Sequence, residues 1–361
     1  MRHRVIAFIL AGLFSAGTLA GCAQLLGIDE LSSGDSIDAM SPVEPDSGPS
    51  MPTCAIDNGG CDPNADCFEA PEGRVCQCRQ GFTGDGLTCI VPWEPIATIP
   101  DRVFYNGFGA FAIGSGSRIF FFPESNDPPP SSFFLSYDIL SGEVREEALP
   151  PPEVNDFCAC GAGQVLVALD DYLYQFGNYG TRYHTTLQTW EELFYPPERA
   201  RGEAAGAALG QRAYTFGGRD NARSVQYFDV TLLDWVDLGP TLPWDLDQGA
   251  AVAVEPNLIY VFGGRVDGVA NRAAVYDAEA NAWQPLPDMP DQLYANRGSG
   301  LASGRPFVVS YETLYSFDPS NGTWSSIPMP MAPYSYATTV IGEVYVVSSV
   351  DGQVEIHRLV N

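Results

Sequence analysis

The sequence predicts an all-β protein in which a small cysteine-rich module precedes a larger domain of repeated sheets. Three observations predict this class. The 361-residue chain is rich in Gly (37) and Pro (29) and has few stretches with the period of an amphipathic helix. Six of its nine cysteines fall between residues 54 and 89. From residue 93 onward, an aromatic residue followed by Asp, and then a Trp, recur along the chain.

Residues 1–21 have the composition of an export signal. A basic start, Met1 to Arg4, precedes an apolar run and then small residues. The run is too short and interrupted for a membrane span. The segment Leu19-Ala20-Gly21-Cys22 resembles the bacterial lipobox. That resemblance implies cleavage before Cys22, lipidation of Cys22 with long acyl chains such as palmitate and, because Asp does not follow, sorting to the outer membrane. An ordinary signal with an incidental Cys is the alternative.

Residues 22–53 are expected to form a disordered tether behind the acylated N-terminus. Residues 23–53 hold six acidic residues and no basic one, together with Ser, Pro and Gly. About 30 flexible residues span roughly 30 Å root-mean-square. The tether would lift the rest of the chain off the membrane, into the periplasm or onto the cell surface.

The next element, residues 54–90, is too short to fold without cross-links. Six cysteines in an exported segment predict three disulfides, for which spacing alone allows 15 connectivities; a zinc site is the weaker alternative. The cysteine spacing, with Gly59-Gly60 and a Gly81-Phe82-x-Gly84-Asp85-Gly86 run, resembles an EGF-like domain. The resemblance implies the pairs Cys54–Cys67, Cys61–Cys76 and Cys78–Cys89. Because residues 50–53 contain no carboxylate, it implies a spacer or adhesion module without calcium.

Two further cysteines, Cys158 and Cys160, are separated by a single Ala. In an exported chain a local disulfide is the favoured interpretation, and a redox or metal-binding pair is the alternative.

Repeats fill residues 93–361. The Asp of Phe228-Asp229, Tyr276-Asp277 and Phe317-Asp318 lies six residues before a Trp in each case. Apolar strands that end in Gly217-Gly218 and Gly263-Gly264 precede two of these pairs. His184 before Trp190, and Asp138 before Val144, mark degenerate units.

This pattern resembles the kelch repeat, and the resemblance implies a six-bladed kelch-type β-propeller with four strands in each blade. Val354–His357 is expected to be the third strand of the last blade, with His357 in the Asp position. The fourth strand is expected at the start of the domain, because Trp93-x2-Ile96-x2-Ile99-Pro100 repeats the spacing that follows Trp283. An N-terminal strand that closes the last blade leaves no open edge between blades.

Charge excludes several functions. The net charge is −27, and all 18 basic residues are Arg. A polyanion is a poor partner for nucleic acid and for anionic lipid, so membrane contact is expected through the lipid anchor alone. The absence of Lys excludes Schiff-base chemistry and a phosphate-binding lysine loop.

The candidate ligand-binding residues are basic and amide side chains near one mouth of the channel. In ligand-binding kelch propellers this mouth is lined by residues after the double glycine and by residues leading into the innermost strand. They are Arg182, Arg219, Asn221 and Arg265 in the first class, and Arg201 and Arg297 in the second. An Arg cluster binds carboxylates, so a carboxylate-bearing sugar or an acidic peptide is the expected ligand. The alternative is that these residues only pair with neighbouring acids such as Glu203 and Asp220.

A membrane-anchored, extracytoplasmic binding or adhesion module that recognises a protein or glycan is therefore the predicted function. An enzyme acting on acidic sugars, similar to the six-bladed kelch N-acetylneuraminate epimerases, is the alternative. No catalytic residue, metal or other cofactor is predicted. A copper site similar to that of galactose oxidase would need His ligands, and the chain has only His3, His184 and His357.

Overall fold

The computed structural model describes residues 54–100 (except 72, 80 and 81), 111–122, 133–149, 165–176, 180–193, 204–218, 222–239, 241–264, 271–293, 296–330, 335–351 and 353–360. The predicted signal, Cys22, the predicted tether and the pair Cys158 and Cys160 lie outside the described residues.

The cysteine-rich module has one short 3-10 segment, η1 (Asp57–Gly60), and two hairpins, β1 (Ala65–Ala70) with β2 (Gly73–Cys78) and β3 (Thr83–Gly84) with β4 (Cys89–Ile90). Its disulfides are Cys54–Cys67, Cys61–Cys76 and Cys78–Cys89, which confirms the predicted pairing. Gly86 has a φ of +82°, and a Cβ there would lie 2.3 Å from the carbonyl oxygen of Cys76. Only glycine fits this turn, so the glycine run is set by the close packing of the second hairpin on the first.

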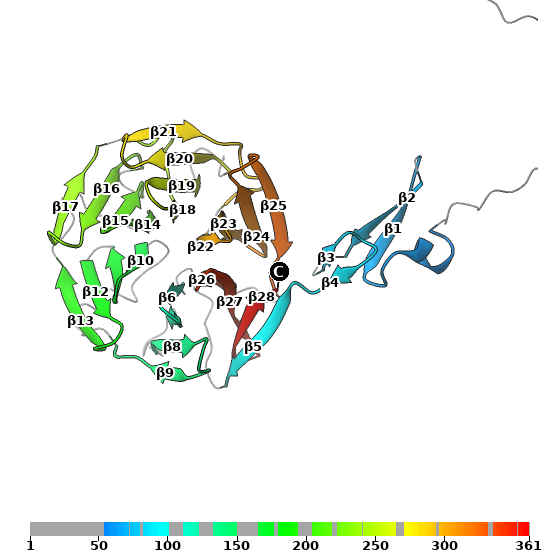
Figure 1. Ribbon diagram of the computed structural model, residues 1–361, viewed down its shortest axis with the longest axis horizontal. Coiled ribbons are helices and arrows are strands. Elements are labelled where there is room, and N and C mark those ends of the chain that lie inside the picture. Colours follow the sequence, from blue (N-terminus) through cyan, green and yellow to red (C-terminus); the bar gives the residue numbers. More distant parts are fainter. Residues whose placement is uncertain are drawn as a thin grey trace, which may run out of the picture. The chain divides into compact units, whose positions relative to one another are not determined.

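Six four-stranded antiparallel sheets form the larger domain and surround a common axis (Figure 1). We number them as blades one to six. They are β6 (Phe111–Ser115), β7 (Arg118–Phe122), β8 (Leu135–Asp138) and β9 (Val144–Glu146); β10 (Val165–Leu169), β11 (Tyr172–Phe176), β12 (Gly180–His184) and β13 (Thr189–Leu193); β14 (Ala205–Leu209), β15 (Arg212–Phe216), β16 (Val225–Asp229) and β17 (Asp234–Asp237); β18 (Gly249–Val254), β19 (Leu258–Gly263), β20 (Ala273–Asp277) and β21 (Ala282–Pro285); β22 (Asn296–Ala302), β23 (Arg305–Ser310), β24 (Thr313–Asp318) and β25 (Thr323–Pro328); and β26 (Ser335–Val340), β27 (Glu343–Val350), β28 (Gln353–Leu359) and β5 (Trp93–Ile99). The predicted six-bladed, all-β fold is confirmed.

The ring closes in the last blade as predicted, because β5 pairs antiparallel with β28. Trp93 lies opposite Leu359, and its indole N–H donates to the carbonyl of Pro328 at 2.7 Å. A second contact closes the ring at its centre, where the backbone N–H of Gly114 in β6 donates to Thr338 Oγ1 in β26 at 2.8 Å. The two ends of the domain therefore meet both in the outermost and in the innermost strands.

One detail of the predicted repeat is wrong. In blades three to five, the Asp ends the third strand and the preceding aromatic residue pairs with the Trp, as Phe228 does with Trp235. In blade six the residue opposite Trp93 is Leu359, so the Asp position falls on Val360 and not on His357. No turn joins β28 to β5, because β5 is the first strand of the domain in sequence order and β28 is the last. An Asp that caps such a turn has no role in this blade.

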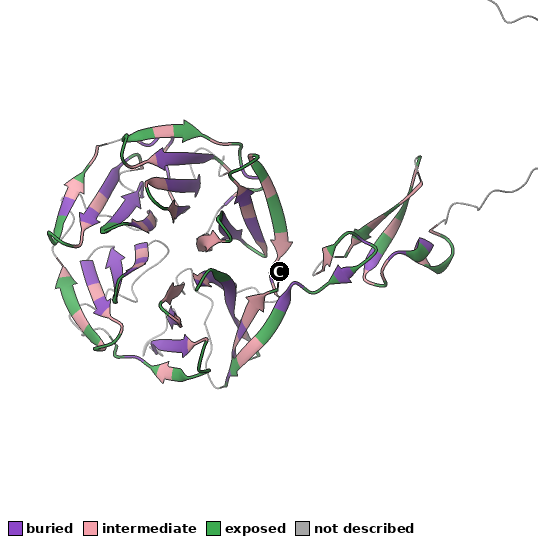
Figure 2. Cartoon of the chain, in the orientation of Figure 1, coloured by how far each residue is buried: buried purple, intermediate pink, exposed green. Residues whose placement is uncertain are grey.

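Aromatic side chains fill the gaps between blades. The Trp235 ring of blade three lies 4.8 Å from Phe176 of blade two, and Trp283 of blade four lies 5.9 Å from Phe216 of blade three. Figure 2 shows that burial is concentrated in the middle strands of each blade and falls toward the outermost ones. The core is thus a set of layers between sheets, which leaves the ends of the strands to form two separate faces.

Candidate functional site

The two faces of the propeller are built from different kinds of connection. Antiparallel pairing places the turns between first and second strands, and between third and fourth strands, on one side, which we call the turn face. The connections between second and third strands, and those between blades, belong to the other side, the loop face. Turn-face connections have two to five residues, whereas the connections between blades have six to 18.

Aspartates cap the turn face. Asp229 Oδ1 accepts the backbone N–H groups of Thr231 and Leu232 at 3.0 and 3.2 Å. Hydrogen bonds from Thr231 lower the pKa of Asp229 despite partial burial, so the cap is ionised. Asp138 and Asp277 make the same pair of backbone contacts. These carboxylates satisfy backbone donors, which makes the repeated Asp structural.

His184 replaces the aspartate in blade two. Its Nδ1 accepts the backbone N–H groups of Thr186 and Leu187, both at 3.3 Å. The ring also lies 4.7 Å from that of Tyr172. The degenerate repeat therefore keeps the capping contact with a different acceptor, and His184 is not available as a metal ligand through Nδ1.

The double glycines shape the loop face. Gly217 and Gly218 have φ angles of +67° and +110°, and a Cβ on Gly217 would lie 2.3 Å from the carbonyl oxygen of Leu246. That carbonyl accepts the N–H of Gly218 at 2.8 Å, and Leu246 N–H donates to Ala222 at 2.7 Å. The glycines thus leave room for the segment that enters the next blade. Leu293 takes the corresponding place, with its Cβ 2.6 Å from where a Cβ on Gly263 would lie.

Trp244 lies in the same entering segment, and its side chain fixes this segment to blade four. Its indole N–H donates to the carbonyl of Gly263 at 2.9 Å. The roles of Trp244, Leu246 and Leu293 were not predicted from the sequence. Their signal is position: Leu246 and Leu293 follow the blade Trp by 11 and 10 residues respectively.

Most predicted ligand-binding residues lie outside the described part of the chain. These are Arg201, Arg219, Asn221 and Arg265, and Arg297 lies in β22 with no described side-chain position. The described neighbours Gly218, Ala222 and Gly264 do lie on the loop face, at the ends of the connections that hold Arg219 and Arg265. A shared Arg-lined mouth therefore stays a prediction.

Arg182 is placed differently from its predicted position. It lies in the middle of β12, because the connection in blade two is only residues 177–179 and the strand starts at Gly180. Its Nη2 and Nε contact Glu191 Oε2 at 2.5 and 2.9 Å, and its Cζ lies 4.3 Å from the centre of the Tyr172 ring. Burial opposes the charged form, but the bonds to Glu191 and Tyr174 outweigh it and raise the pKa of Arg182. This Arg stabilises blade two from within its sheet.

The inner strands of blades two to four give the channel a wall of small side chains. The described wall residues of β10, β14 and β18 are Val, Leu, Ala and Gly. A Cβ on Gly206 would lie 2.0 Å from Val165 Cγ1, and one on Gly114 would lie 2.0 Å from the carbonyl oxygen of Thr339. Neighbouring blades therefore approach so closely that backbone and small groups line this wall. The inner strands of blades two to four thus offer few polar side chains to a ligand, whereas those of blades five and six include Ser299, Thr338 and Thr339.

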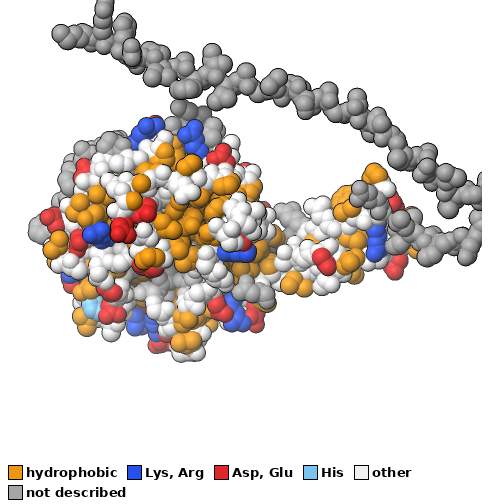
Figure 3. Space-filling model, turned by 45° about the horizontal axis from the view of Figure 1, so that its top comes forward, with side chains coloured by type: hydrophobic (Ala, Val, Ile, Leu, Met, Phe, Trp, Pro, Cys, Tyr) orange, Lys and Arg blue, Asp and Glu red, His pale blue; other side chains and the backbone are white. Residues whose placement is uncertain are grey.

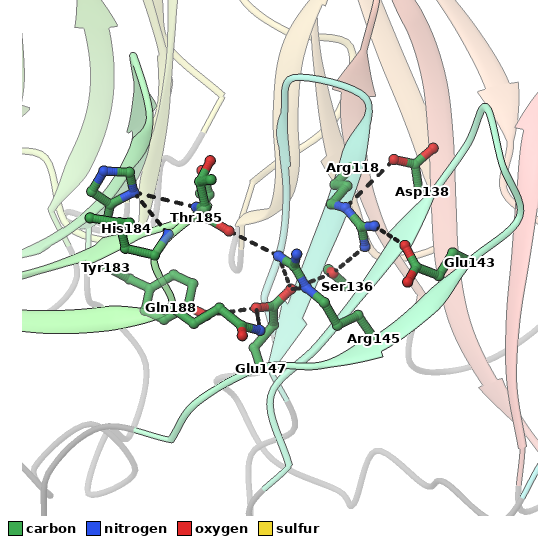
Figure 4. A network of polar contacts seen from close by, with 12 residues as sticks. Arg118, Ser136, Asp138, Glu143, Arg145, Glu147, Tyr183, His184, Thr185 and Gln188 are labelled. Atoms are coloured by element: carbon green, nitrogen blue, oxygen red, sulfur yellow. Dashed lines mark hydrogen bonds and ion pairs between the residues drawn. The ribbon is translucent and has the colours of Figure 1, made fainter.

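A buried carboxylate joins blades one and two (Figure 4). Glu147 Oε1 accepts from Ser136 and Arg145 at 2.5 and 2.7 Å, and Oε2 accepts from Tyr183 and Gln188 at 2.6 and 2.9 Å. Burial raises the pKa of Glu147, but these four hydrogen bonds together lower it below its ordinary value. Two donors on each oxygen saturate the carboxylate, so it is poorly placed to take a proton from a substrate. This contact between blades was not predicted from the sequence.

Charges on the side of the propeller seen in Figure 3 are mixed, with Arg and acidic side chains interspersed around a gathering of hydrophobic ones. Among the described residues, no group of His, Cys, Asp and Glu is arranged to hold a metal ion. Within the described ranges, which begin at residue 54, no helix has the length and apolar character needed to cross a bilayer.

Comparison with known proteins identifies both modules. Residues 54–89 match the EGF domain family, and residues 248–290, which include blade four, match the Kelch motif. Kelch-like protein 36 of Mus musculus is 32% identical over 135 residues, which are 33% of this chain and 22% of that protein. Kelch-like protein terF of Aspergillus terreus is 25% identical over 216 residues, covering 52% of this chain and 46% of that protein. The chain thus spans less than half the length of these curated relatives.

A solved structure has the same fold. The structure of YjhT superposes with a TM-score of 0.53 and 11% identity, and covers 73% of this chain and 94% of that one. At this identity the likeness concerns the propeller fold alone.

Proposed function

We propose that this chain is a lipid-anchored, extracytoplasmic binding protein whose propeller recognises a protein or glycan ligand through the loop face. A kelch propeller fits a protein-binding module. The observation that carries the proposal is a structural difference between the two faces. Capped turns satisfy their own polar groups on the turn face, and the connections that hold Arg201, Arg219, Asn221 and Arg265 all belong to the loop face.

The connections on the loop face differ in length from blade to blade. The connections between second and third strands have 12, 3, 8 and 9 residues in blades one to four, but only 2 in blades five and six. We place the ligand over the first four blades. Arg219 and Arg265, which follow the double glycines of blades three and four, would bind its carboxylates.

A binding screen with a matched control tests the ligand site. The exported chain carrying Cys22→Ser would be presented to sialylated glycans, their neutral counterparts and acidic peptides. Replacing Arg219 and Arg265 together with Ala should weaken binding of the carboxylate-bearing probe at least tenfold. Arg305→Ala removes a cation of the turn face, which pairs with Asp318 at 2.7 Å, and should leave binding unchanged. Equal losses in both variants would contradict the proposal.

The same proteins separate binding from catalysis. A binding module should not accelerate exchange between the anomers of N-acetylneuraminate. Acceleration that disappears in the variant lacking Arg219 and Arg265 would instead support an enzyme acting on acidic sugars.

The anchor and the envelope location are part of the proposal. An EGF-like module with three disulfides suits a secreted or surface protein, because such bonds persist in oxidising compartments. Cells fed an alkyne-tagged palmitate should label the wild-type chain and not the Cys22→Ser variant. Label retained in that variant would refute acylation at Cys22.

A further inference from the structure

The outermost strand of blade five lacks the protection that the other five blades have. Among the described strands, the fourth strand of each blade is the last of its sheet, and such edges pair with other strands unless charge or proline prevents it. The two residues after the Trp position can be compared directly across the ring, because the registers of all six fourth strands are described. These positions hold Arg145-Glu146, Glu191-Glu192, Val236-Asp237, Gln284-Pro285, Ser325-Ser326 and Glu94-Pro95 in blades one to six respectively.

Blade five alone among these carries neither a charge nor a proline at the two positions. Its strand β25 is also six residues long and uncharged throughout, and proline enters only at its last residue, Pro328. Thr323, Ser325 and Ser326 are exposed, and β25 lies on the outer rim (Figure 1). The edge is therefore open to an additional strand along most of its length.

We propose that β25 pairs with β25 of a second copy of this chain, in antiparallel register about a two-fold axis at Ser325. In two-fold antiparallel pairing the residue on the axis lies opposite its own counterpart, and its neighbours in the strand lie close to it across the axis. The pairing therefore requires an edge without charge, and this is the property that distinguishes β25. On the edge of blade two it would bring Glu191 and Glu192 against the same residues of the copy. A two-fold axis perpendicular to the joined sheet places Ser325 opposite Ser325, Trp324 opposite Ser326 and Thr323 opposite Ile327. None of these pairs opposes like charges.

Long-range electrostatic repulsion between the two copies opposes this association. Two copies with a net charge of −27 each repel one another, and salt screens that repulsion over about 8 Å at 0.15 M ionic strength. Dimers held by an uncharged edge should thus be more abundant at 0.3 M than at 0.02 M NaCl. Association through ion pairs would have the opposite dependence.

Sedimentation velocity of the exported Cys22→Ser chain tests the proposal. We expect a monomer–dimer equilibrium between 1 and 200 µM protein that Ser325→Glu shifts at least tenfold toward monomer. Gln284→Glu is the matched control, since it adds the same charge at the same position of blade four, where Pro285 already blocks the edge. A wild-type chain that stays monomeric at 200 µM in 0.3 M NaCl, or two variants with equal effect, would overturn the proposal.

If Ser325→Glu does not fold, a cysteine variant tests pairing through β25 instead. Residues directly opposite in an antiparallel pair have Cα atoms about 4.5–5.5 Å apart, within the range a disulfide spans. Ser325→Cys should therefore form a covalent dimer under mild oxidation, and Gln284→Cys should not. Failure of Ser325→Cys to cross-link, or equal cross-linking of both variants, would contradict pairing through β25.

Discussion

Replacing Glu147 with Gln should lower the free energy of unfolding of the propeller by about 3 kcal/mol. The carboxylate accepts four hydrogen bonds, and the amide presents two N–H donors where one oxygen accepted two of them. Each lost bond to a charged acceptor costs about 1.5–3 kcal/mol, and rotation of the Tyr183 hydroxyl recovers part of one. Arg145 also loses its ionic partner but remains partly hydrated, because 29% of its side chain is exposed.

Urea and thermal unfolding measure this loss. For a domain of this size about 3 kcal/mol corresponds to a melting temperature roughly 6–12 °C lower. Glu192→Gln is the control, because Glu192 is an exposed carboxylate on the rim of blade two. Its effect should stay within about 0.5 kcal/mol, as for most surface substitutions.

The pH dependence of the Glu147 effect follows from the direction of its pKa shift. The pKa of Glu147 is lowered in the fold, so the unfolded chain binds the proton more readily in acid. The stabilisation is complete above the ordinary Glu pKa of about 4.3 and is lost as pH falls through the folded value. The difference between wild type and Glu147→Gln should therefore be constant from pH 8 to about 5.5 and shrink below about pH 4. A difference under 0.5 kcal/mol at pH 7, or one unchanged at pH 3, would refute the reasoning.

Four further predictions, one of them with a control variant, test other parts of the fold. Trp93→Ala should cost about 3–5 kcal/mol in urea unfolding, because it removes a buried indole and its bond to Pro328 from the closing strand. Leu246→Ala should cost about 3 kcal/mol, whereas Leu232→Ala on the turn face, where Leu232 is 71% exposed, should cost under about 0.5. Burial lowers the pKa of His357, so the unfolded chain is protonated first; wild-type stability should fall as pH drops below about 6.5, and His357→Gln should lack that part of the slope. His184→Asp should keep the wild-type melting temperature or raise it, because Asp supplies the cap used in the other blades, and a lower temperature would contradict the capping role.

The architecture could be predicted because its determinants are local and repeated. Each aromatic–Asp pair marks the end of a third strand, and the spacing after Trp93 matched that after Trp283 closely enough to predict the shared last blade. The disulfide pairing, by contrast, came from the resemblance to EGF-like domains, since spacing alone left 15 possibilities. The error at His357 has a physical origin: without a turn after β28 there is no backbone donor to cap, and the sequence is free to depart from the repeat.

The polar contact between blades one and two could not be predicted from the sequence, for a different reason. Glu147 follows the short strand β9, and its partners Tyr183 and Gln188 come from the next blade, 36 and 41 residues away. No spacing rule links these positions. Arg182 was expected at the channel mouth, but only residues 177–179 separate β11 from β12, so Arg182 lies within β12.

The two proposals concern different parts of the ring, and this separation makes each of them testable alone. Blades five and six contribute only two-residue connections between their second and third strands, so these connections offer less chain to a ligand on the loop face than those of blades one, three and four. The unprotected edge β25 belongs to one of these two blades and lies on the rim. Pairing through β25 therefore leaves the loop faces of blades one to four free in both copies.

Two joined copies would present two ligand sites, and a multivalent glycan or a repeated peptide would be bound more tightly than a monovalent one. Ser325→Glu should remove this gain while leaving monovalent affinity intact, and loss of Arg219 and Arg265 should abolish carboxylate binding while leaving the dimer intact. A single variant that removed both properties without unfolding the chain would show that the two surfaces are not independent.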